Sequence, residues 1–280
     1  MKWQSNNAEA NDVRRFSVAG TFYPGDPVEL ASTVERLTLS EPAKAGKKIR
    51  GIIAPHAGYV YSGQTAGAVY GRLAGFEYDT VVVVAPSHRE FFEGVSVYEG
   101  SAYATPLGVI AVDRALREEL IEASPIVHAS LAGHRSEHAV EVHLPFLQKV
   151  LTHFLLLPLV IGHQTPEVCF GLGKALGEIL KKRDALVVAS TDLSHFYPDD
   201  VAKQKDAVMI EDVARFDDES LMAHLEDGST EACGGGPTVA VLAALKCLGA
   251  NCAEIIAYAT SGDVTGDRSS VVGYLGAIVY

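Results

Sequence analysis

The 280-residue sequence has little of what several classes of protein require. Lys and Arg number 23 against 35 Asp and Glu, so the formal net charge is −12 and a polyanion finds no general attraction. We therefore expect neither nucleic acid nor an anionic membrane as a partner. No apolar run approaches the roughly 18 residues that span a bilayer, and the opening segment lacks the apolar region of a signal peptide. These absences predict a soluble, cytoplasmic protein.

Cysteine is also scarce. The four cysteines form neither a C-x-x-C pair nor a dense framework, which excludes a zinc finger and a disulfide-stabilised secreted scaffold. The spacing suits a reducing compartment. We interpret Cys169, Cys247 and Cys252 as buried, unreactive thiols.

No Pro/Ser-rich linker or repeat interrupts the chain, and 48% of its residues are hydrophobic, which is ample for a sizeable core. Strands are predicted at Ile49–Ala54, Thr80–Ala85, Leu155–Ile161, Leu186–Ser190, Glu254–Tyr258 and Val271–Val279. Helices are predicted at Pro27–Leu37, Gln64–Leu73, Arg114–Ala123, Glu137–Leu151, Pro166–Lys182, Val201–Arg215, Glu219–Glu226 and Thr238–Leu248. This alternation predicts an α/β fold with a central, largely parallel sheet flanked by helices.

The strand-like runs are almost continuously apolar, which is typical of strands buried on both faces. We expect a single domain over residues 13–280, preceded by a polar N-terminal tail over residues 1–12. The segments Gly94–Tyr98 and Gly108–Val112, joined through TPLG, are expected to form a hairpin at the sheet edge.

Ionisable side chains follow three of the predicted strands. His56 follows IRGIIAP, His88 follows TVVVVAPS, and Asp192 and His195 follow LVVASTD. Because ligands bind beyond the carboxyl ends of parallel strands, these side chains are expected at one rim. A single histidine in a turn is most often an ordinary hydrogen-bonded residue, but the repetition at three strand ends favours a metal or proton-transfer site.

Cys233 is a further candidate, in the segment EACGGGP. The three glycines and Pro237 indicate that a helix begins beside the thiol. A helix N-terminus favours the thiolate, which is the form that binds metals or attacks electrophiles.

The densest histidine cluster is GHRSEHAVEVHLPF. It is similar to the inverted zincin motif, but His138 and His143 are five residues apart and would point about 140° from each other on a helix. They therefore cannot share one metal. Glu137 and Glu141, four apart, share a helix face. From this cluster we expect His143 or Glu141 to line the site. The remaining histidines are interpreted as surface or loop residues: His128, His134, His153, His163 and His224.

Several segments, in order from Val18 onward, together resemble the Memo family, called AmmeMemoRadiSam system protein B in prokaryotes. They are VAGTFYPGD, IIAPHAGYVYSG, VVVVAPSH, YATPLG, SEHAVEVHLPFL, STDLSHF, EACGGGP and YATSGDVTGDRSSVVGYLGAIVY. The resemblance implies a fold related to class III extradiol dioxygenases, which are non-haem iron(II) enzymes. It also implies a metal bound by His56, His88 and Cys233, with Asp192 and His195 beside it.

One position departs from that family. Many relatives carry an arginine just after the cysteine-glycine pair, where this chain has Gly235. A cation that holds an anionic substrate group is therefore missing, and the substrate class of better-known relatives does not carry over.

Two imidazoles and one anionic ligand leave open positions on a metal, as in iron(II) oxygenases, and a thiolate also admits copper or zinc. We expect a metal-dependent redox enzyme, with iron(II), acting on a small molecule or a modified group. His195 would serve as acid or base and Asp192 would orient it or hydrogen-bond bound water. Tyr59 and Tyr61, on the loop after His56, are expected either to bind substrate or to pack that loop.

Two alternatives stay open at this stage. The first is a zinc hydrolase, in which the same open site activates water. The second is a non-catalytic adaptor, because eukaryotic relatives are described as signalling proteins that recognise phosphotyrosine peptides. The prokaryotic family name further implies a radical SAM protein and an AMMECR-type protein as partners.

Overall fold

The computed structural model describes residues 12–39 and 47–280. Most of the expected N-terminal tail, residues 1–11, lies outside the described residues. Asp12, which the sequence places in that tail, contacts the folded part of the chain: its carbonyl accepts a hydrogen bond from Ser101 N at 2.8 Å. Packed structure therefore begins by residue 12.

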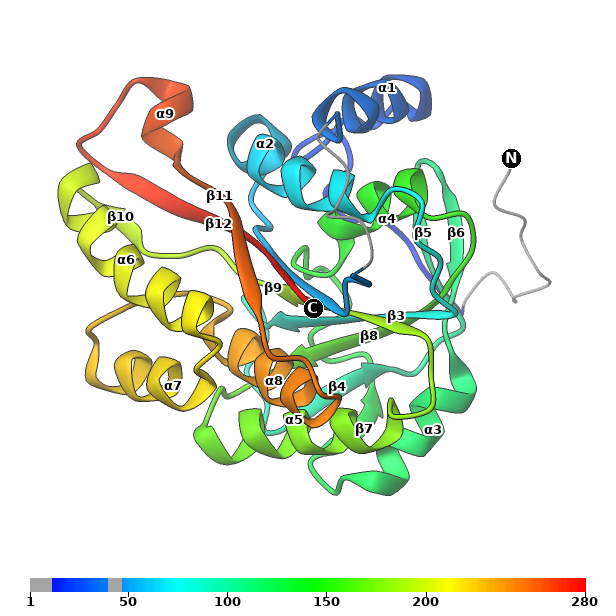
Figure 1. Cartoon of the computed structure of the whole chain (residues 1–280). Helices are drawn as coiled ribbons and strands as arrows, with labels where there is room; N and C mark the ends of the chain where they lie inside the picture. Colours follow the sequence, from blue (N-terminus) through cyan, green and yellow to red (C-terminus); the bar gives the residue numbers. More distant parts are fainter. Residues whose placement is uncertain (1–11, 40–46) are drawn as a thin grey trace.

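A nine-stranded mixed sheet runs through the described chain, in the order β10-β12-β2-β9-β3-β8-β4-β7 with β11 beside β12 (Figure 1). Its four middle strands pair in parallel: β2 (Gly51–Ala54), β9 (Ala185–Ser190), β3 (Thr80–Pro86) and β8 (Leu155–Ile161). Antiparallel pairs join β2 to β12 (Val271–Val279), and β12 to both β10 (His195–Tyr197) and β11 (Ala253–Thr260). At the other edge, β4 (Val95–Tyr98) pairs antiparallel to β8 and parallel to β7 (Val127–Ser130).

The expected hairpin between Gly94–Tyr98 and Gly108–Val112 is wrong. β4 pairs within the main sheet, whereas β6 (Gly108–Ala111) pairs with β5 (Ala102–Thr105) in a separate three-stranded sheet that includes β1 (Val13–Arg14). The two-residue loop inside TPLG joins the strands that flank it directly. Gly108 has φ 134°, a conformation that glycine adopts without a steric penalty, so the turn can close at that position.

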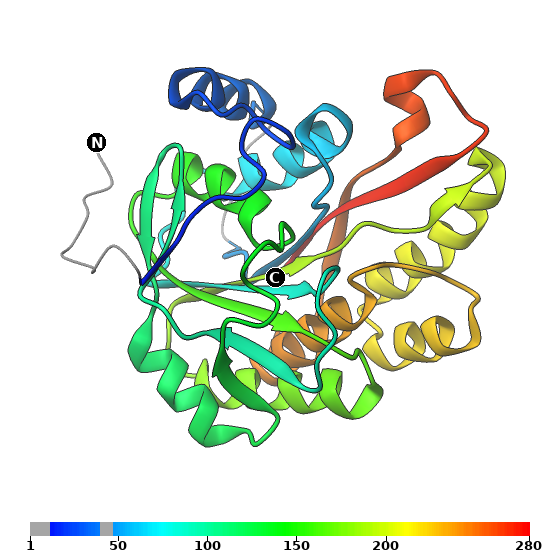
Figure 2. The same cartoon turned by 180° about the vertical axis from the view of Figure 1, so that it is seen from behind.

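The alternating side chains of the central strands pack into two cores. Val82 and Val84 of β3 pack with α5 (Pro166–Ile179) and α8 (Gly235–Cys247). Their neighbours in β3, including Val81 and Val83, pack on the opposite face with α1 (Pro27–Leu37), α2 (Tyr59–Tyr70) and α4 (Leu144–Val150). Figures 1 and 2 show these two helical layers on either side of the sheet. Burial on both faces explains why the strands are almost continuously apolar.

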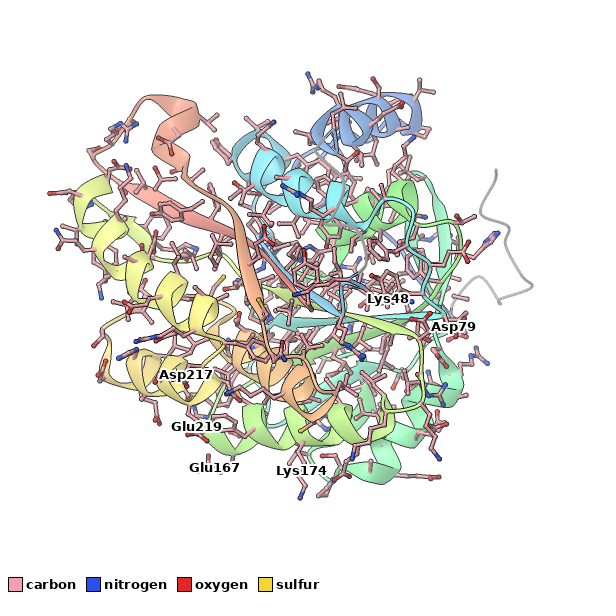
Figure 3. The ribbon with its side chains drawn as sticks, viewed as in Figure 1. Lys48, Asp79, Glu167, Lys174, Asp217 and Glu219 are labelled. Carbon is pink, nitrogen blue, oxygen red and sulfur yellow. The ribbon has the colours of Figure 1, made fainter. Side chains whose placement is uncertain are left out.

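The other helices lie around this three-layer arrangement. They are α3 (Arg114–Ala123), α6 (Asp199–Arg215), α7 (Asp218–Asp227) and α9 (Ser261–Thr265), with short 3-10 turns at Gly71–Leu73 (η1) and Glu141–His143 (η2). Charged side chains of the outer helices, such as Glu167 and Lys174 of α5, point away from the sheet (Figure 3). Over residues 12–39 and 47–280, no helix is long and apolar enough to cross a membrane.

Two predicted helices differ from the structure where they matter for the site. Helix α2 begins at Tyr59 rather than Gln64, so Tyr59 and Tyr61 lie in its first turn and not in a loop. The helix predicted over Glu137–Leu151 begins late, because residues 137–140 are not helical and η2 precedes α4. The carbonyl of Glu137, which would accept a helical hydrogen bond, instead accepts one from the Arg14 guanidinium.

Candidate metal centre

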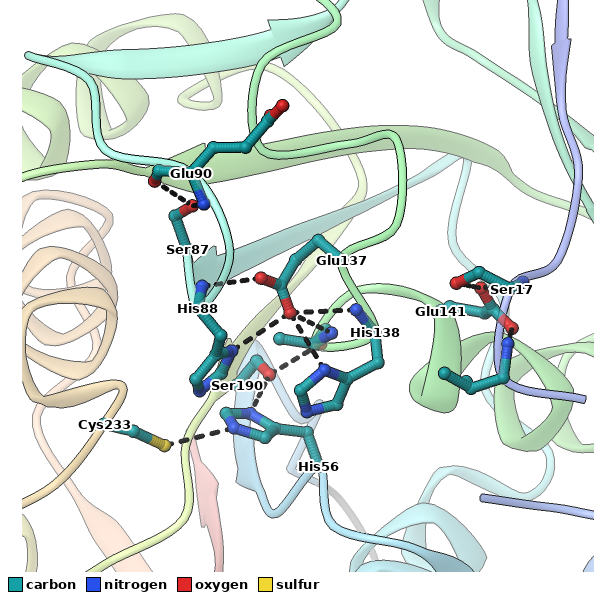
Figure 4. Close-up of polar contacts among 12 residues, drawn as sticks. Ser17, His56, Ser87, His88, Glu90, Glu137, His138, Glu141, Ser190 and Cys233 are labelled. Atoms are coloured by element: carbon teal, nitrogen blue, oxygen red, sulfur yellow. Dashed lines mark hydrogen bonds and ion pairs between the residues drawn. The ribbon is translucent and has the colours of Figure 1, made fainter. Parts of the chain in front are cut away.

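The parallel strands bring three predicted site residues to one edge of the sheet. His56, His88 and Asp192 each lie two residues beyond the last residue of β2, β3 and β9. Because these strands are adjacent and run in the same direction, their side chains emerge together. Cys233 approaches from the start of α8. The nitrogen and sulfur ligand atoms of His56, His88 and Cys233 all lie within 4.8 Å of one another (Figure 4).

Hydrogen bonds determine which nitrogen of His56 faces this cluster. The Ser190 hydroxyl donates its proton to the Ala139 carbonyl at 2.7 Å, so its oxygen accepts from His56 Nδ1 at 2.7 Å. Nδ1 therefore carries the proton, and the lone pair of Nε2 points to Cys233 Sγ, 3.1 Å away. Burial, followed by the neighbouring His88, keeps the pKa of His56 well below its ordinary value. The imidazole is thus neutral, as a metal ligand must be.

Glu137 orients His88 in the same way. Its carboxylate accepts hydrogen bonds from His88 N at 2.6 Å and from His88 Nδ1 at 3.0 Å, which leaves Nε2 for the cluster. The amides of His138 and Ala139 donate to the same carboxylate at 2.8 and 3.0 Å. Burial raises the pKa of Glu137, but the hydrogen bonds from His138 and His88 outweigh burial and hold that pKa far below its usual value. A carboxylate that supports a ligating histidine is a common feature of metal sites.

His138 is a member of the cluster that sequence analysis missed. Its ring centroid lies 4.8 Å from that of His88 and 5.4 Å from that of His56, and its Nδ1 is 3.1 Å from Glu137 Oε1. The sequence pattern predicts His138 on a helix, where it would point about 140° away from His143 and could not share a metal with it. The adjacent glutamate and histidine were the available signal, but the irregular backbone of residues 137–140 was not predicted.

Glu141 does not face this cluster. It is fully buried and forms an ion pair with Arg14, with 2.5 Å between Nη1 and Oε2. Tyr23 Oη donates to its other oxygen at 2.6 Å, and Ser17 N and Val18 N also donate to the carboxylate. Figure 4 shows Glu141 and Ser17 apart from the histidines. Both oxygens of Glu141 are thus occupied by structural partners, and the expected contact of Glu141 with a substrate stays a prediction.

His143 is also buried, and the Tyr70 hydroxyl lies 2.9 Å from its Nδ1. Burial, with His138 nearby, lowers the pKa of His143 to about 3. Its Nε2 has no hydrogen-bond partner among the described residues. A substrate contact by His143 stays a prediction.

The two tyrosines of α2 have different surroundings. Tyr59 is buried and its hydroxyl donates to the Val142 carbonyl at 2.7 Å, while Tyr61 is 44% exposed. The contacts of Tyr59 fit the alternative of packing, whereas the exposure of Tyr61 leaves it accessible to a substrate. Substrate binding by either residue stays a prediction.

Asp192 and His195 lie beside the thiol. Asp192, His195 and Cys233 form a second group whose ligand atoms are all within 4.8 Å of one another. Asp192 Oδ1 accepts a hydrogen bond from His56 N at 2.8 Å, which ties the ends of β2 and β9 together. Burial raises the pKa of Asp192, and the hydrogen bond from His56 partly opposes that rise. His195 begins β10 and is partly exposed, so it borders both the cluster and solvent.

The cysteines require two corrections. The expectation that the helix start favours a thiolate does not hold for the metal-free protein, because burial and then the Asp192 charge raise the pKa of Cys233 well above its ordinary value. A bound cation would reverse that balance. Cys169 is buried as predicted, but Cys247 and Cys252 are exposed. Cys247 is the last residue of α8, and although it lies beside Gly177 of α5 it stays exposed.

The sequence predicts His134 at the surface or in a loop; it lies in a turn, as one of these alternatives has it, but it is buried. Its Nδ1 lies 2.6 Å from the Tyr103 hydroxyl and its Nε2 lies 3.2 Å from the Ser96 carbonyl, so both ring nitrogens are satisfied without water. Burial lowers its pKa to about 3. His128, His153 and His163 are exposed as predicted, and His224 pairs with Asp212 at 2.7 Å.

The donor set fits a transition metal. The Nε2 atoms of His56 and His88 are available to a metal, because the Nδ1 atom of each ring is hydrogen-bonded to Ser190 or Glu137. The Cys233 thiol, which becomes anionic when it binds a metal, is the third ligand of the group. The nearby group of His88, Glu137 and His138 fits less well, since the Glu137 carboxylate already accepts four hydrogen bonds. We therefore treat Glu137 as support for His88 rather than as a ligand.

Comparison with known proteins agrees with this arrangement of motifs. The model of the family described as "Memo-like protein" matches residues 14–278. A MEMO1 family protein of Aquifex aeolicus is 41% identical over 267 residues, covering 95% of this chain and 98% of the relative. A MEMO1 family protein of Methanothermobacter thermautotrophicus is 38% identical over 272 residues, covering 94% and 98%. The chain belongs to the Memo family.

A solved structure shows the same general fold. The crystal structure of an uncharacterized protein from Escherichia coli K12 aligns with a TM-score of 0.54 at 17% identity, covering 81% of this chain and 99% of the other. At this level of identity the likeness concerns the fold alone.

Proposed function

We propose that this protein is a metal-dependent redox enzyme in which His56, His88 and Cys233 hold a non-haem iron(II) ion. The observation that carries the proposal is the convergence of the three ligand atoms within 4.8 Å, with each imidazole already oriented by Ser190 or Glu137. When bound, iron(II) would supply one-electron chemistry with dioxygen as the oxidant. Three protein ligands leave room on the metal for a substrate and the oxidant.

The neighbouring side chains have separate roles in this proposal. His195 moves a proton to or from the substrate at a ring nitrogen, because it is the histidine that borders both the cluster and solvent. Asp192, whose position is determined by the amide of His56, orients His195 and hydrogen-bonds water at the site. His138 stands over the other side of the cluster, where its ring would contact the substrate.

The substrate proposed is a small molecule or a modified group. An open cavity of about 650 Å³ lies next to the Cys233 segment and is lined by Ala232, Gly235, Gly236 and Tyr197, among others; its lining does not include His56, His88 or Cys233, so it adjoins the candidate metal centre rather than containing it. This volume is in the range of small-molecule sites. A Cβ on Gly235 would lie 2.7 Å from the Leu225 side chain, so any larger residue at this position would require Leu225 to shift.

Three further parts of the proposal are tested separately from the metal. A relationship to class III extradiol dioxygenases, and partnership with a radical SAM protein and an AMMECR-type protein, derive from the Memo resemblance. A cytoplasmic location derives from the composition of the sequence.

Metal analysis of anaerobically purified protein is the first test. Wild-type protein should contain close to one iron per chain, and His56→Ala, His88→Ala and Cys233→Ala should each lose most of it. Full retention in all three variants would contradict the ligand assignment. His195→Ala should keep the metal and lower the rate of oxygen uptake with cell extract by about 100- to 10,000-fold.

Two outcomes would favour the alternatives. Stoichiometric zinc, with hydrolysis but no oxygen uptake, would favour a zinc hydrolase. A peptide or protein that binds equally well to wild type and to the metal-free Cys233→Ala variant, without any metal-dependent turnover, would favour an adaptor.

A further inference from the structure

Gln164 contacts the segment that carries Cys233. It lies between β8 and α5, and since β8 runs parallel to β3, it emerges at the same sheet edge as His88. Gln164 Nε2 donates a hydrogen bond to the Cys233 carbonyl at 2.8 Å, and Gln164 Oε1 accepts one from Gly236 N at 2.8 Å. One planar amide therefore joins both ends of the segment Cys233–Gly236.

Neither of these backbone groups obtains a partner from α8. In a regular helix the Cys233 carbonyl would accept a hydrogen bond from the N–H of residue 237, but Pro237 has no N–H. Gly236 N lies in the first turn of α8, where N–H groups have no intrahelical acceptor. Gln164 supplies both missing partners.

The segment also depends on outside contacts for its conformation. Three consecutive glycines restrict the backbone little, so their geometry is determined by what they touch. On the inner side, Cys233 N donates to the Asp192 carbonyl at 3.2 Å. On the outer side, the backbone of Gly236 packs closely on Gln164, and a Cβ there would lie 2.8 Å from its Oε1.

We propose that Gln164 is a positioning residue for Cys233, which keeps Sγ 3.1 Å from His56 Nε2. The inference rests on the proposed function, in which Cys233 is a metal ligand. Without the amide, the glycine segment gains conformational freedom and Sγ leaves the cluster more often. A bound metal then dissociates faster, and the thiol of metal-free protein becomes more accessible.

The experiment compares Gln164→Leu and Gln164→Glu with Gln164 in full-length protein. All three proteins carry Cys247→Ser and Cys252→Ser, so that the exposed thiols do not react. Two rates are measured: the release of bound cobalt to a chelator, and the alkylation of Cys233 by iodoacetamide in metal-free protein. Both variants should release cobalt about 10- to 100-fold faster, the usual effect of losing a residue that supports a ligand. Both should also be alkylated faster. Gln164→Glu should raise both rates as well, because the carboxylate oxygen that faces the Cys233 carbonyl has no proton to donate to it.

Gln148→Leu is the matched control. Gln148 is a buried glutamine of α4 whose Oε1 accepts a hydrogen bond from Thr105 Oγ1 at 2.5 Å. Its loss should lower the melting temperature without changing either rate. Wild-type rates in both Gln164 variants, with unchanged circular dichroism, would overturn the proposal. If Cys233→Ala retained its metal, the proposed function would fail, and the alkylation rate alone would decide whether Gln164 positions the thiol.

Discussion

Glu137 holds His88 at two points, because its carboxylate accepts hydrogen bonds from both the backbone N and the ring Nδ1 of that histidine. The same carboxylate accepts hydrogen bonds from the backbone amides of His138 and Ala139, so it also determines the conformation of its own loop. Ring orientation and loop position at the candidate metal centre thus depend on one buried side chain.

Glu137→Gln should weaken metal binding without removing a ligand. An amide can accept at only one end, so its NH₂ group would face a donor of His88. We expect the dissociation constant for cobalt or zinc to rise about 10- to 100-fold, measured by competition with a chelator. Glu90→Gln is the control, since Glu90 accepts hydrogen bonds from Gly133 N and Arg135 nearby. Equal affinity of the Glu137 variant and wild type would contradict a supporting role.

The ion pair between Arg14 and Glu141 should be important for stability, because both side chains are almost fully buried. Arg14→Met leaves a buried carboxylate without its cation and leaves the carbonyls of His134 and Glu137 without a donor. The free energy of unfolding should fall by about 3–5 kcal/mol, measured by urea denaturation. Arg114→Met removes the exposed pair with Asp12 and should cost less than about 1 kcal/mol. Similar losses in the two variants would argue against this account.

Metal-free protein should lose stability as the pH falls below about 6.5. The pKa values of His134 and His143 are lowered to about 3 by burial, and that of His56 is also well below its ordinary value. Between pH 6.5 and 3 the unfolded chain therefore binds more protons than the folded one, so the free energy of unfolding decreases on acidification. The raised pKa values of Asp192 and Asp206 act in the opposite direction at the acid end of that range.

A variant isolates one of these histidines. His143→Gln should reduce the decrease in unfolding free energy between pH 6 and 5 by about 1 kcal/mol, because one proton fewer is taken up on unfolding. Urea denaturation at the two pH values measures this slope. His163→Gln, at an exposed position, should leave it unchanged. An unchanged slope in His143→Gln would show that this histidine titrates normally in the fold.

Phe196→Gly should stabilise the protein, or at least not destabilise it. Phe196 has φ 65°, a left-handed conformation unfavourable for a bulky residue, and its side chain is 76% exposed. Replacement by glycine should relieve about 1–2 kcal/mol of strain and cost about 0.5–1 kcal/mol because unfolded glycine has greater freedom, so the free energy of unfolding should rise by up to about 1.5 kcal/mol.

Phe216 provides the comparison for that variant. It has φ 57° but is 6% exposed and belongs to the core. Phe216→Gly should therefore destabilise the protein by about 2 kcal/mol or more, because the lost burial exceeds the relieved strain. Urea denaturation of both variants tests the pair, and a large loss of stability in Phe196→Gly would show that the contact of its ring with His195 stabilises the fold.

Reagents should reach the cysteines in an order set by exposure. Cys247 and Cys252 are exposed, Cys233 is partly buried with a raised pKa, and Cys169 is buried with its pKa raised to about 12. Iodoacetamide should modify the first two before Cys233, and bound metal should slow Cys233 further. Peptide mapping by mass spectrometry measures the order. Early modification of Cys233 would indicate that its segment opens in solution.

Much of the fold followed from local patterns. The predicted strand Leu155–Ile161 and helices Pro27–Leu37 and Arg114–Ala123 have the observed bounds, because continuous apolar runs and helix caps are visible over a few residues. Asp26 and Asp113 cap their helices through side-chain hydrogen bonds to backbone amides. The true partners of β4 and β6 were not predicted, because both segments have the pattern of short strands and the partner of β4 is distant in sequence.

The sequence by itself determined that His56, His88 and Asp192 lie together, since each follows a buried strand at the same interval and parallel strands end at one edge. Tertiary structure alone decided which residues of the cluster Gly133–Phe146 reach that edge. Arg14, more than 100 positions away, forms a buried ion pair with Glu141. Its guanidinium also donates a hydrogen bond to the Glu137 carbonyl, which therefore does not accept a helical hydrogen bond. As a result the side chains of Glu137 and His138 lie beside His56 and His88. The local sequence pattern does not depend on a charge so distant in the chain. Periodicity therefore could not predict that Glu137 supports the site and that Glu141 pairs with Arg14.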